Sequence, residues 1–173
     1  EPASEGAERH GFRRIPEDEL TTEASRLHWH RVVEQGLPSN YAGGTVGAVV
    51  RDLEGNLAAG TSTGGTMGKK PGRVGDSPII GSGTYADDVC AVSATGEGEA
   101  FMRSVFAARV SDAVRFGKEP SEALESMLNR VQTFFGGLGG AILVSKDSGP
   151  HVFWTTVGMS HGWWTPDESG CGI

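Results

Sequence analysis

Two short apolar stretches, both within residues 46–63, are separated by a polar segment. They run from Val46 to Val50 and from Leu57 to Thr63, and both are rich in small and β-branched side chains. The segment between them, Asp52 to Asn56, contains a glycine, which suits a tight turn. This pattern predicts a β-hairpin. Because Thr45 and Thr63 stand at the outer ends of the two strands, the hairpin brings them to neighbouring positions.

The C-terminal two thirds of the chain continue with strand-like and helix-like patterns. The predicted strands cover Val89–Thr95, Ala141–Ser145 and His151–Val157. The predicted helices cover Glu99–Phe116 and a segment that begins at Pro120 and ends at Gly136. Strands followed by two helices and then by further strands indicate a layered α+β domain, with helices packed on a largely antiparallel sheet.

The first 44 residues are predicted to contain a helix followed by a linker. An acidic start just after Pro16 and an imperfect apolar stripe predict a helix from Glu17 to about Gln35. His28 and His30 lie on different faces of this helix, which favours solvated or packed histidines over a metal site. The following segment, Pro38 to Gly44, has the composition of an exposed linker.

Residues 64–88 form a long predicted loop, with one short strand expected at Ile79–Ile80. Loops of this length in compact domains are usually functional. Arg73 and Asp76 lie three residues apart in it. Such a pair can hold a zwitterion, because the guanidinium binds a carboxylate and the aspartate accepts from an ammonium. The alternative is a simple salt bridge between the two residues within the loop.

Thr95 and Gly96 follow a predicted strand and precede a predicted helix. Their hydroxyl and backbone N–H can therefore point at a developing oxyanion, although an ordinary helix cap accounts for the pattern equally well. Two other motifs are weaker. Ser62 lies in a G-x-S-x-G pattern, but no helix follows it, and Gly68-Lys69 lacks the first glycine and the final hydroxyl residue of a phosphate-binding loop.

Composition narrows the functional classes. The chain has 173 residues and a net charge of −7, which fits one folded domain and argues against binding to nucleic acid. No segment approaches the roughly 18 apolar residues of a membrane span. Two cysteines, Cys90 and Cys171, are too few for a disulfide framework and favour a reducing compartment, so we expect a cytoplasmic protein. The start, Glu1 to Glu5, has no initiating Met and no leader pattern, so we expect that a segment has been removed or that the chain is a fragment.

The residues around Thr45 suit a peptide bond that cleaves itself. Gly43 and Gly44 form a small, flexible dipeptide directly before this hydroxyl residue, which opens an apolar strand. Cleavage between Gly44 and Thr45 frees an α-amino group with a reference pKa of about 7.7–8.0, suited to a general base near neutrality. Thr45 then carries both the nucleophile and the base.

Several motifs together resemble the plant-type L-asparaginase and isoaspartyl peptidase family of N-terminal-nucleophile hydrolases. The resemblance runs from about Gly6 to the C-terminus and is most specific between Gly44 and Arg103. The matching motifs are Thr45-Val46-Gly47-Ala48-Val49, Ala59-Gly60-Thr61-Ser62-Thr63-Gly64-Gly65, Gly72-Arg73-Val74-Gly75-Asp76-Ser77-Pro78, Gly83-Thr84-Tyr85-Ala86 and Cys90-Ala91-Val92-Ser93-Ala94-Thr95-Gly96-Glu97-Gly98-Glu99. Thr155 to Met159 matches a late family strand only loosely.

The resemblance implies autocleavage between Gly44 and Thr45 into two subunits that stay together in an αββα sandwich. Residues 1–44 would be the C-terminal end of the α-subunit with its linker, and residues 45–173 the catalytic β-subunit. Two such heterodimers usually pair. Family precursors carry a much longer segment before the scissile glycine, so we expect the sandwich to be incomplete in this chain.

The resemblance also assigns roles by position. Thr45 would be the nucleophile, with Thr63 as its hydrogen-bond partner. Thr95 and the Gly96 N–H would form the oxyanion hole.

For the substrate, the resemblance implies that Arg73 binds the α-carboxylate, while Asp76 and the Gly98 carbonyl bind the α-ammonium. The reaction would be hydrolysis of a β-amide of aspartate, in asparagine or a β-aspartyl dipeptide, through a β-aspartyl-threonine ester. No cofactor and no metal site are expected in this chain, although a structural Na or K ion is compatible with the missing segment. Glycosylasparaginase shares these motifs and is the nearest enzymatic alternative. A non-catalytic truncated relative is the alternative from another class.

Overall fold

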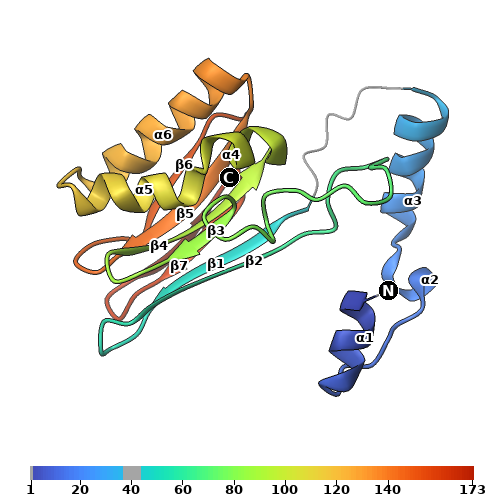
Figure 1. The fold of residues 1–173 in the computed structure, drawn as a ribbon, viewed down its shortest axis with the longest axis horizontal. Helices are drawn as coiled ribbons and strands as arrows, with labels where there is room; N and C mark the ends of the chain where they lie inside the picture. Colours follow the sequence, from blue (N-terminus) through green and yellow to red (C-terminus); the bar gives the residue numbers. More distant parts are fainter. Residues whose placement is uncertain (1, 37–43) are drawn as a thin grey trace. The chain divides into compact units, whose positions relative to one another are not determined.

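The chain divides into two compact units, residues 1–41 and 42–173. A computed structural model describes residues 2–36 and 44–173 (Figure 1). The first unit contains α1 (Pro2–Arg9), α2 (Glu17–Leu20), α3 (Glu23–Trp29) and the π-helix η1 (His30–Glu34).

The single helix predicted from Glu17 to Gln35 is therefore interrupted. The interruption lies at Thr22, whose side chain caps α3 by accepting a hydrogen bond from the Ser25 N–H at 3.1 Å. No residue of α3 or η1 is buried. Of the predicted linker, only Gly44 lies within the described residues.

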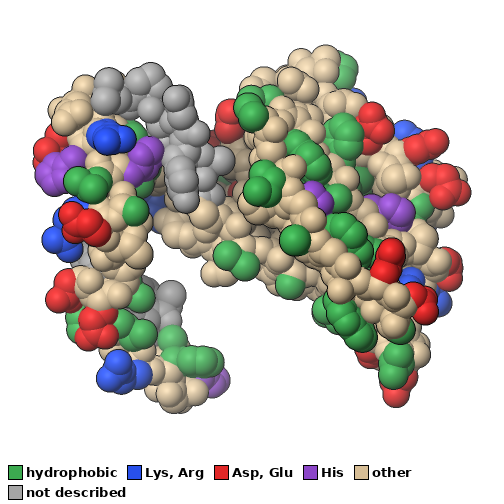
Figure 2. All heavy atoms as spheres, turned by 180° about the vertical axis from the view of Figure 1, so that it is seen from behind, with side chains coloured by type: hydrophobic (Ala, Val, Ile, Leu, Met, Phe, Trp, Pro, Cys, Tyr) green, Lys and Arg blue, Asp and Glu red, His purple; other side chains and the backbone are tan. Residues whose placement is uncertain are grey.

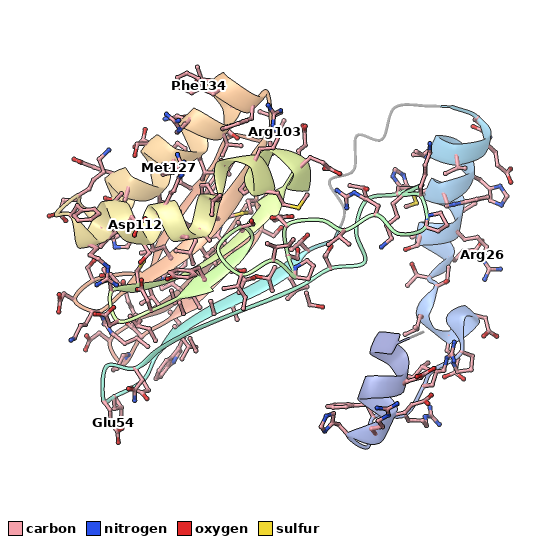
Figure 3. All side chains as sticks on the ribbon, viewed as in Figure 1. Arg26, Glu54, Arg103, Asp112, Met127 and Phe134 are labelled. Atoms are coloured by element: carbon pink, nitrogen blue, oxygen red, sulfur yellow. The ribbon has the colours of Figure 1, made fainter. Side chains whose placement is uncertain are left out.

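The second unit begins with the predicted hairpin. Strands β1 (Val46–Arg51) and β2 (Leu57–Ser62) pair antiparallel, with Val46 opposite Ser62. Both strands agree with the prediction to within one residue. Glu54 lies at the tip of the connecting turn, at the far end of the hairpin from Thr45 (Figure 3).

A four-stranded antiparallel sheet with the order β3-β4-β5-β6 forms the centre of this unit. The strands are β3 (Thr84–Ala86), β4 (Cys90–Gly96), β5 (Gly139–Ser145) and β6 (His151–Trp154). The strand predicted at Ile79–Ile80 is wrong, because Ile80 forms only an isolated bridge with Thr84. A further hairpin, β7 (His161–Trp164) with β8 (Ser169–Gly172), was not predicted.

Three helices cover one face of the four-stranded sheet: α4 (Gly98–Ser104), α5 (Phe106–Arg115) and α6 (Pro120–Phe135). The single helix predicted from Glu99 to Phe116 is divided at Val105, which has a left-handed φ of 50°. At the start of α5, loop carbonyls accept the hydrogen bonds that a continuous helix would make. The N–H groups of Ala107 and Ala108 donate to the carbonyl oxygens of Ser82 and Gly81. A tertiary contact therefore sets this helix boundary.

The unit has three layers, because the β1–β2 hairpin lies against the face of the sheet opposite to the helices (Figure 1). The apolar core lies between helices and sheet. Its largest fully buried side chains are Phe101, Phe106, Leu124, Leu128, Leu143, Val92, Val110 and Val131. Other hydrophobic side chains are scattered over the surface of this unit (Figure 2). No helix in residues 2–36 or 44–173 is long and apolar enough to cross a membrane.

Candidate active site

Thr45 lies directly before β1 and faces Thr63, which lies directly after β2. The Thr45 hydroxyl donates to Thr63 Oγ1 at 3.2 Å. Thr63 Oγ1 also accepts from the Gly65 N–H at 3.0 Å, so the loop after β2 orients this hydroxyl. The structure therefore brings together the two threonines at the ends of the hairpin strands.

A group of hydroxyl side chains sets the distance between the hairpin and the sheet. Thr61 on β2 shares a 2.6 Å hydrogen bond with Ser93 on β4, and the Thr84 hydroxyl donates to Thr61. The two layers approach so closely at Gly47 that a Cβ there would lie 2.2 Å from Ser93 Oγ. A glycine two residues after Thr45 thus lets β1 reach its place over β4.

Thr95 and Gly96 end β4, one layer below the hairpin. Gly96 has a φ of +149°, and a Cβ there would lie 2.4 Å from the Leu138 carbonyl oxygen, so only glycine fits. The Glu97 N–H donates to Leu138, and by ladder alternation the Gly96 N–H points away from β5. Glu97, not Thr95, is the N-cap residue of α4, so the simple cap interpretation of Thr95 is wrong.

Thr45 and Thr95 both line a cavity of about 480 Å³. It opens between the start of β1, the end of β4 and the segment that leads into β7. Its walls are formed by Thr45, Val46, Gly47, Ser93, Ala94, Thr95, Ile142, Met159, Ser160, His161 and Gly162. With Thr45 as a nucleophile and with Thr95 and the neighbouring Gly96 N–H as hydrogen-bond donors, this arrangement would suit acyl transfer.

Arg73 and Asp76 lie in a second cluster. Arg73 forms an ion pair with Glu99 on α4, with Nε and Nη2 donating to the two carboxylate oxygens at 2.9 Å each. Hydrogen bonding between the two side chains is the largest cause of the raised pKa of Arg73 and of the lowered pKa of Glu99. The interpretation of Arg73 and Asp76 as a salt bridge within the loop is therefore wrong, because Arg73 pairs with Glu99 on α4.

Asp76 is 6% exposed, and burial raises the pKa of its carboxyl group. Its Oδ2 has no hydrogen-bond partner among the described residues. Gly98 packs directly against it, since a Cβ on Gly98 would lie 2.8 Å from Asp76 Oδ1. A buried carboxylate with an unpaired oxygen is suited to accept hydrogen bonds from a cationic amine.

The predicted site residues thus form two groups, one around Thr45 and one around Asp76. The segment from Thr95 to Gly98 joins them along the chain. Glu99 was missed as a partner of Arg73, because no local pattern connects residues 26 positions apart. Ser93 was also missed, although its hydroxyl in an otherwise apolar strand was a visible signal.

Within residues 2–36 and 44–173, no group of three or more His, Cys, Asp or Glu side chains could hold a metal ion. His30, considered with His28 as a possible ligand, shares a 2.6 Å hydrogen bond with Glu34 one helical turn away.

Comparison with known proteins gives a consistent result. A sequence profile of the family described as Asparaginase matches residues 3–171. Isoaspartyl peptidase/L-asparaginase of Xenopus laevis is 39% identical over 171 residues, covering 96% of this chain and 55% of that protein. Probable isoaspartyl peptidase/L-asparaginase 2 of Arabidopsis thaliana is 47% identical over 135 residues, covering 76% and 41%. Isoaspartyl peptidase of Escherichia coli strain K12 is 44% identical over 122 residues, covering 69% and 38%.

The chain spans about half the length of the curated relatives it matches. The profile nevertheless covers nearly the whole chain, including both clusters of predicted site residues. The chain belongs to the asparaginase family.

Proposed function

We propose that this chain carries the nucleophile of a threonine hydrolase that cleaves β-amide bonds of aspartate. The substrates are L-asparagine, which yields aspartate and ammonia, and β-aspartyl dipeptides. The observation that carries the proposal is the Thr45–Thr63 hydroxyl pair at 3.2 Å, at the ends of two paired strands and beside the cavity that Thr95 shares. Family membership supports the same chemistry.

The first step in this proposal is cleavage of the chain itself. Thr45 Oγ1 attacks the carbonyl carbon of Gly44, the C–N bond breaks, and the nitrogen takes up the hydroxyl proton. The resulting ester is hydrolysed by water, which leaves a carboxylate on Gly44 and a free amine on Thr45. In the intact chain the same nitrogen is an amide and cannot act as a base.

In turnover, the free Thr45 amine takes the proton from Oγ1, which attacks the β-carbonyl carbon of the substrate. Thr95 and the Gly96 N–H donate to the tetrahedral oxyanion. Collapse of this intermediate expels ammonia or an amino acid, which receives the proton from the Thr45 ammonium, and leaves a β-aspartyl ester on Thr45. Water then attacks this ester and releases aspartate.

Substrate binding uses the second cluster. Arg73 binds the α-carboxylate, because a guanidinium matches a carboxylate geometrically and carries a permanent charge. Asp76 and the Gly98 carbonyl accept from the α-ammonium. Asp76 Oδ2, which has no partner within residues 2–36 and 44–173, supports this assignment, since a cation there would compensate a buried carboxylate.

We assign residues 1–44 to the end of an α-subunit and residues 45–173 to the β-subunit of an αββα sandwich, two heterodimers of which form a dimer. The outer face of the β1–β2 hairpin supports this arrangement. Val46 is 71% exposed and Val50 is 55% exposed on it, which leaves apolar strand surface for another layer to cover.

The intact mass of the purified protein tests the proposal. We expect two fragments, one ending at Gly44 and one beginning at Thr45, together with hydrolysis of asparagine or a β-aspartyl dipeptide. A single uncut mass with no hydrolysis would contradict the proposal for this chain. If the protein cleaved a glycosylated asparagine but neither asparagine nor a β-aspartyl dipeptide, the proposed substrate class would be wrong.

A further inference from the structure

The ion pair between Arg73 and Glu99 uses one particular edge of the guanidinium group. Nε and Nη2 donate to Glu99, both at 2.9 Å. Five N–H donors are present on an arginine, so three remain, two on Nη1 and one on Nη2. Glu99 therefore fixes the plane of the guanidinium without using all of its binding capacity.

The remaining end of the guanidinium lies beside the backbone that carries Asp76. A Cβ on Gly75 would be 3.1 Å from Arg73 Nη1, and a Cβ on Gly98 would be 3.3 Å from Gly75 Cα. Nη1 thus lies next to the segment that carries Asp76, whose buried Oδ2 has no hydrogen-bond partner in the part of the chain that the structure describes. The unused donors of Arg73 and the carboxylate of Asp76 therefore belong to neighbouring segments of one loop.

Asp76 can compete with Glu99 for the guanidinium of Arg73. The two residues lie three positions apart, and their charges attract, which partly offsets the effect of burial on the pKa of Asp76. Desolvated opposite charges pair strongly when geometry allows. If they paired, each would satisfy the other, and neither would be available to a zwitterionic ligand.

We propose that Glu99 is a positioning residue that holds Arg73 away from Asp76, so that both groups stay available to an amino acid's α-carboxylate and α-ammonium. The identity of the ligand rests on the proposed function. The separation of Arg73 from Asp76 does not, and it can be measured without any ligand.

The exposure of the two partners supports an orienting role. The Arg73 side chain is 20% exposed, whereas that of Glu99 is 61% exposed. An ion pair with one partner so open to water adds little to stability, because solvent screens it. A bidentate geometry nevertheless specifies direction, which is what separating two neighbouring charges requires.

The experiment compares Glu99→Gln with Glu97→Gln in the whole protein. Glu97 is an exposed carboxylate two residues away, and its side chain makes no capping hydrogen bond, so its variant controls for the loss of one charge. Carbon-13 NMR titration of Asp76 in the ligand-free protein is the first readout. Removing the Glu99 charge lowers the pKa of Asp76 by itself, so both substitutions are also made in an Arg73→Gln background. We expect Glu99→Gln to lower the pKa by more when Arg73 is present, because the guanidinium turns toward Asp76, and Glu97→Gln to change it in neither background.

Calorimetric binding of L-aspartate is the second readout. We expect affinity to fall about tenfold to a hundredfold in Glu99→Gln, the range for losing charge-assisted hydrogen bonds, and to recover partly in Glu99→Asp. A fall in the Asp76 pKa of the same size with and without Arg73, or no fall at all in folded Glu99→Gln, overturns the proposal. If the wild type binds no L-aspartate but the fall in the Asp76 pKa still depends on Arg73, the positioning role stands and the proposed function fails.

Discussion

Strands β4 and β1 lie in adjacent layers, yet their environments differ sharply. Residues 90–94 of β4 are all buried, because helices cover one face of this strand and the hairpin covers the other. On β1, by contrast, Val46 and Val50 expose more than half of their surface. The predicted oxyanion donors thus stand at the end of a largely enclosed strand, and the predicted nucleophile directly precedes an open one.

The difference shows how this site is held. Packing against Phe101 and the other core side chains fixes β4. The hairpin is tied down mainly by polar contacts, from Arg51 to the carbonyls of Ser145 and Lys146 at 2.8 Å and from Thr61 to Ser93. The position of Thr45 therefore depends on a few directional bonds rather than on a large buried area.

The largest expected effect comes from Thr45→Ala, which removes the hydroxyl of the predicted nucleophile, directly before the open strand β1. We expect no cleavage at Gly44 and a loss of hydrolysis of at least about 10³-fold, because nucleophile and base belong to the same residue. Intact mass and release of ammonia from asparagine are the measurements.

Thr45→Ser is the matched control, since it keeps the side-chain hydroxyl and, after cleavage, the α-amine of the same residue. We expect it to retain cleavage and part of the activity. Asparaginase activity in Thr45→Ala at the level of Thr45→Ser would contradict the assigned mechanism.

Phe101→Ala tests the enclosed side of the comparison. Phe101 is fully buried and its ring packs edge to face on that of Phe106, with centroids 4.9 Å apart. We expect a loss of about 3–5 kcal/mol in the free energy of unfolding, from lost burial and the cavity left behind. Urea unfolding measures it. Val50→Ala on the open face serves as control and should cost less than about 1 kcal/mol; equal losses would remove the contrast between the two strands.

Gly47→Ala tests the contact between the two layers. The added methyl group would meet Ser93 Oγ, whose place is fixed by its bond to Thr61. We expect destabilisation of about 1–3 kcal/mol, typical of overpacking, together with slower cleavage at Gly44. Thermal unfolding and intact mass report the two effects.

A second substitution sharpens this prediction. Ser93→Ala removes the oxygen that the new methyl group would meet and leaves Ser93 Cβ, which lies 3.1 Å from that position. The double variant should recover part of the loss, giving a favourable coupling energy in a double-mutant cycle. Strictly additive effects would show that the close approach at Gly47 does not set the position of β1.

Local patterns predicted the elements whose boundaries depend on nearby residues. The hairpin around Asp52–Asn56 follows from its turn and its apolar strands, and the start of α6 follows from Pro120. The division between α4 and α5 could not be predicted, because Val105 adopts a left-handed conformation and carbonyls from a distant loop cap α5. Likewise, β7 is short and rich in Trp and Gly, with no clear alternation.

The candidate site shows the same limit. The approach of Thr45 to Thr63 follows from antiparallel pairing alone, so the sequence was sufficient to predict it. The partner of Arg73 was not predictable from spacing, since Glu99 reaches it only through the packing of α4 against the loop. The roles of these residues in catalysis stay predictions.

The smallest expected effect concerns the start of β4 and depends on pH. Burial raises the pKa of Asp87, but hydrogen bonds from Ser111, from the N–H groups of Val89 and Cys90 and from Arg115 outweigh it, and the net pKa is lowered. A carboxyl group with a lowered pKa stabilises the folded state above its unfolded value of about 3.9. This stabilisation is lost as the pH falls through the folded pKa.

Urea unfolding between about pH 2 and pH 6 measures this effect, and Asp87→Asn should remove part of the acid dependence. Asp112→Asn is the control, because Asp112 is an exposed carboxylate on α5 (Figure 3). The same acid dependence in Asp87→Asn as in the wild type would show that the tie between β4 and α5 through Arg115 adds nothing to the enclosed strand. A reduced dependence in Asp87→Asn alone would show that β4 is held by a directional polar contact as well as by packing, which narrows its difference from β1.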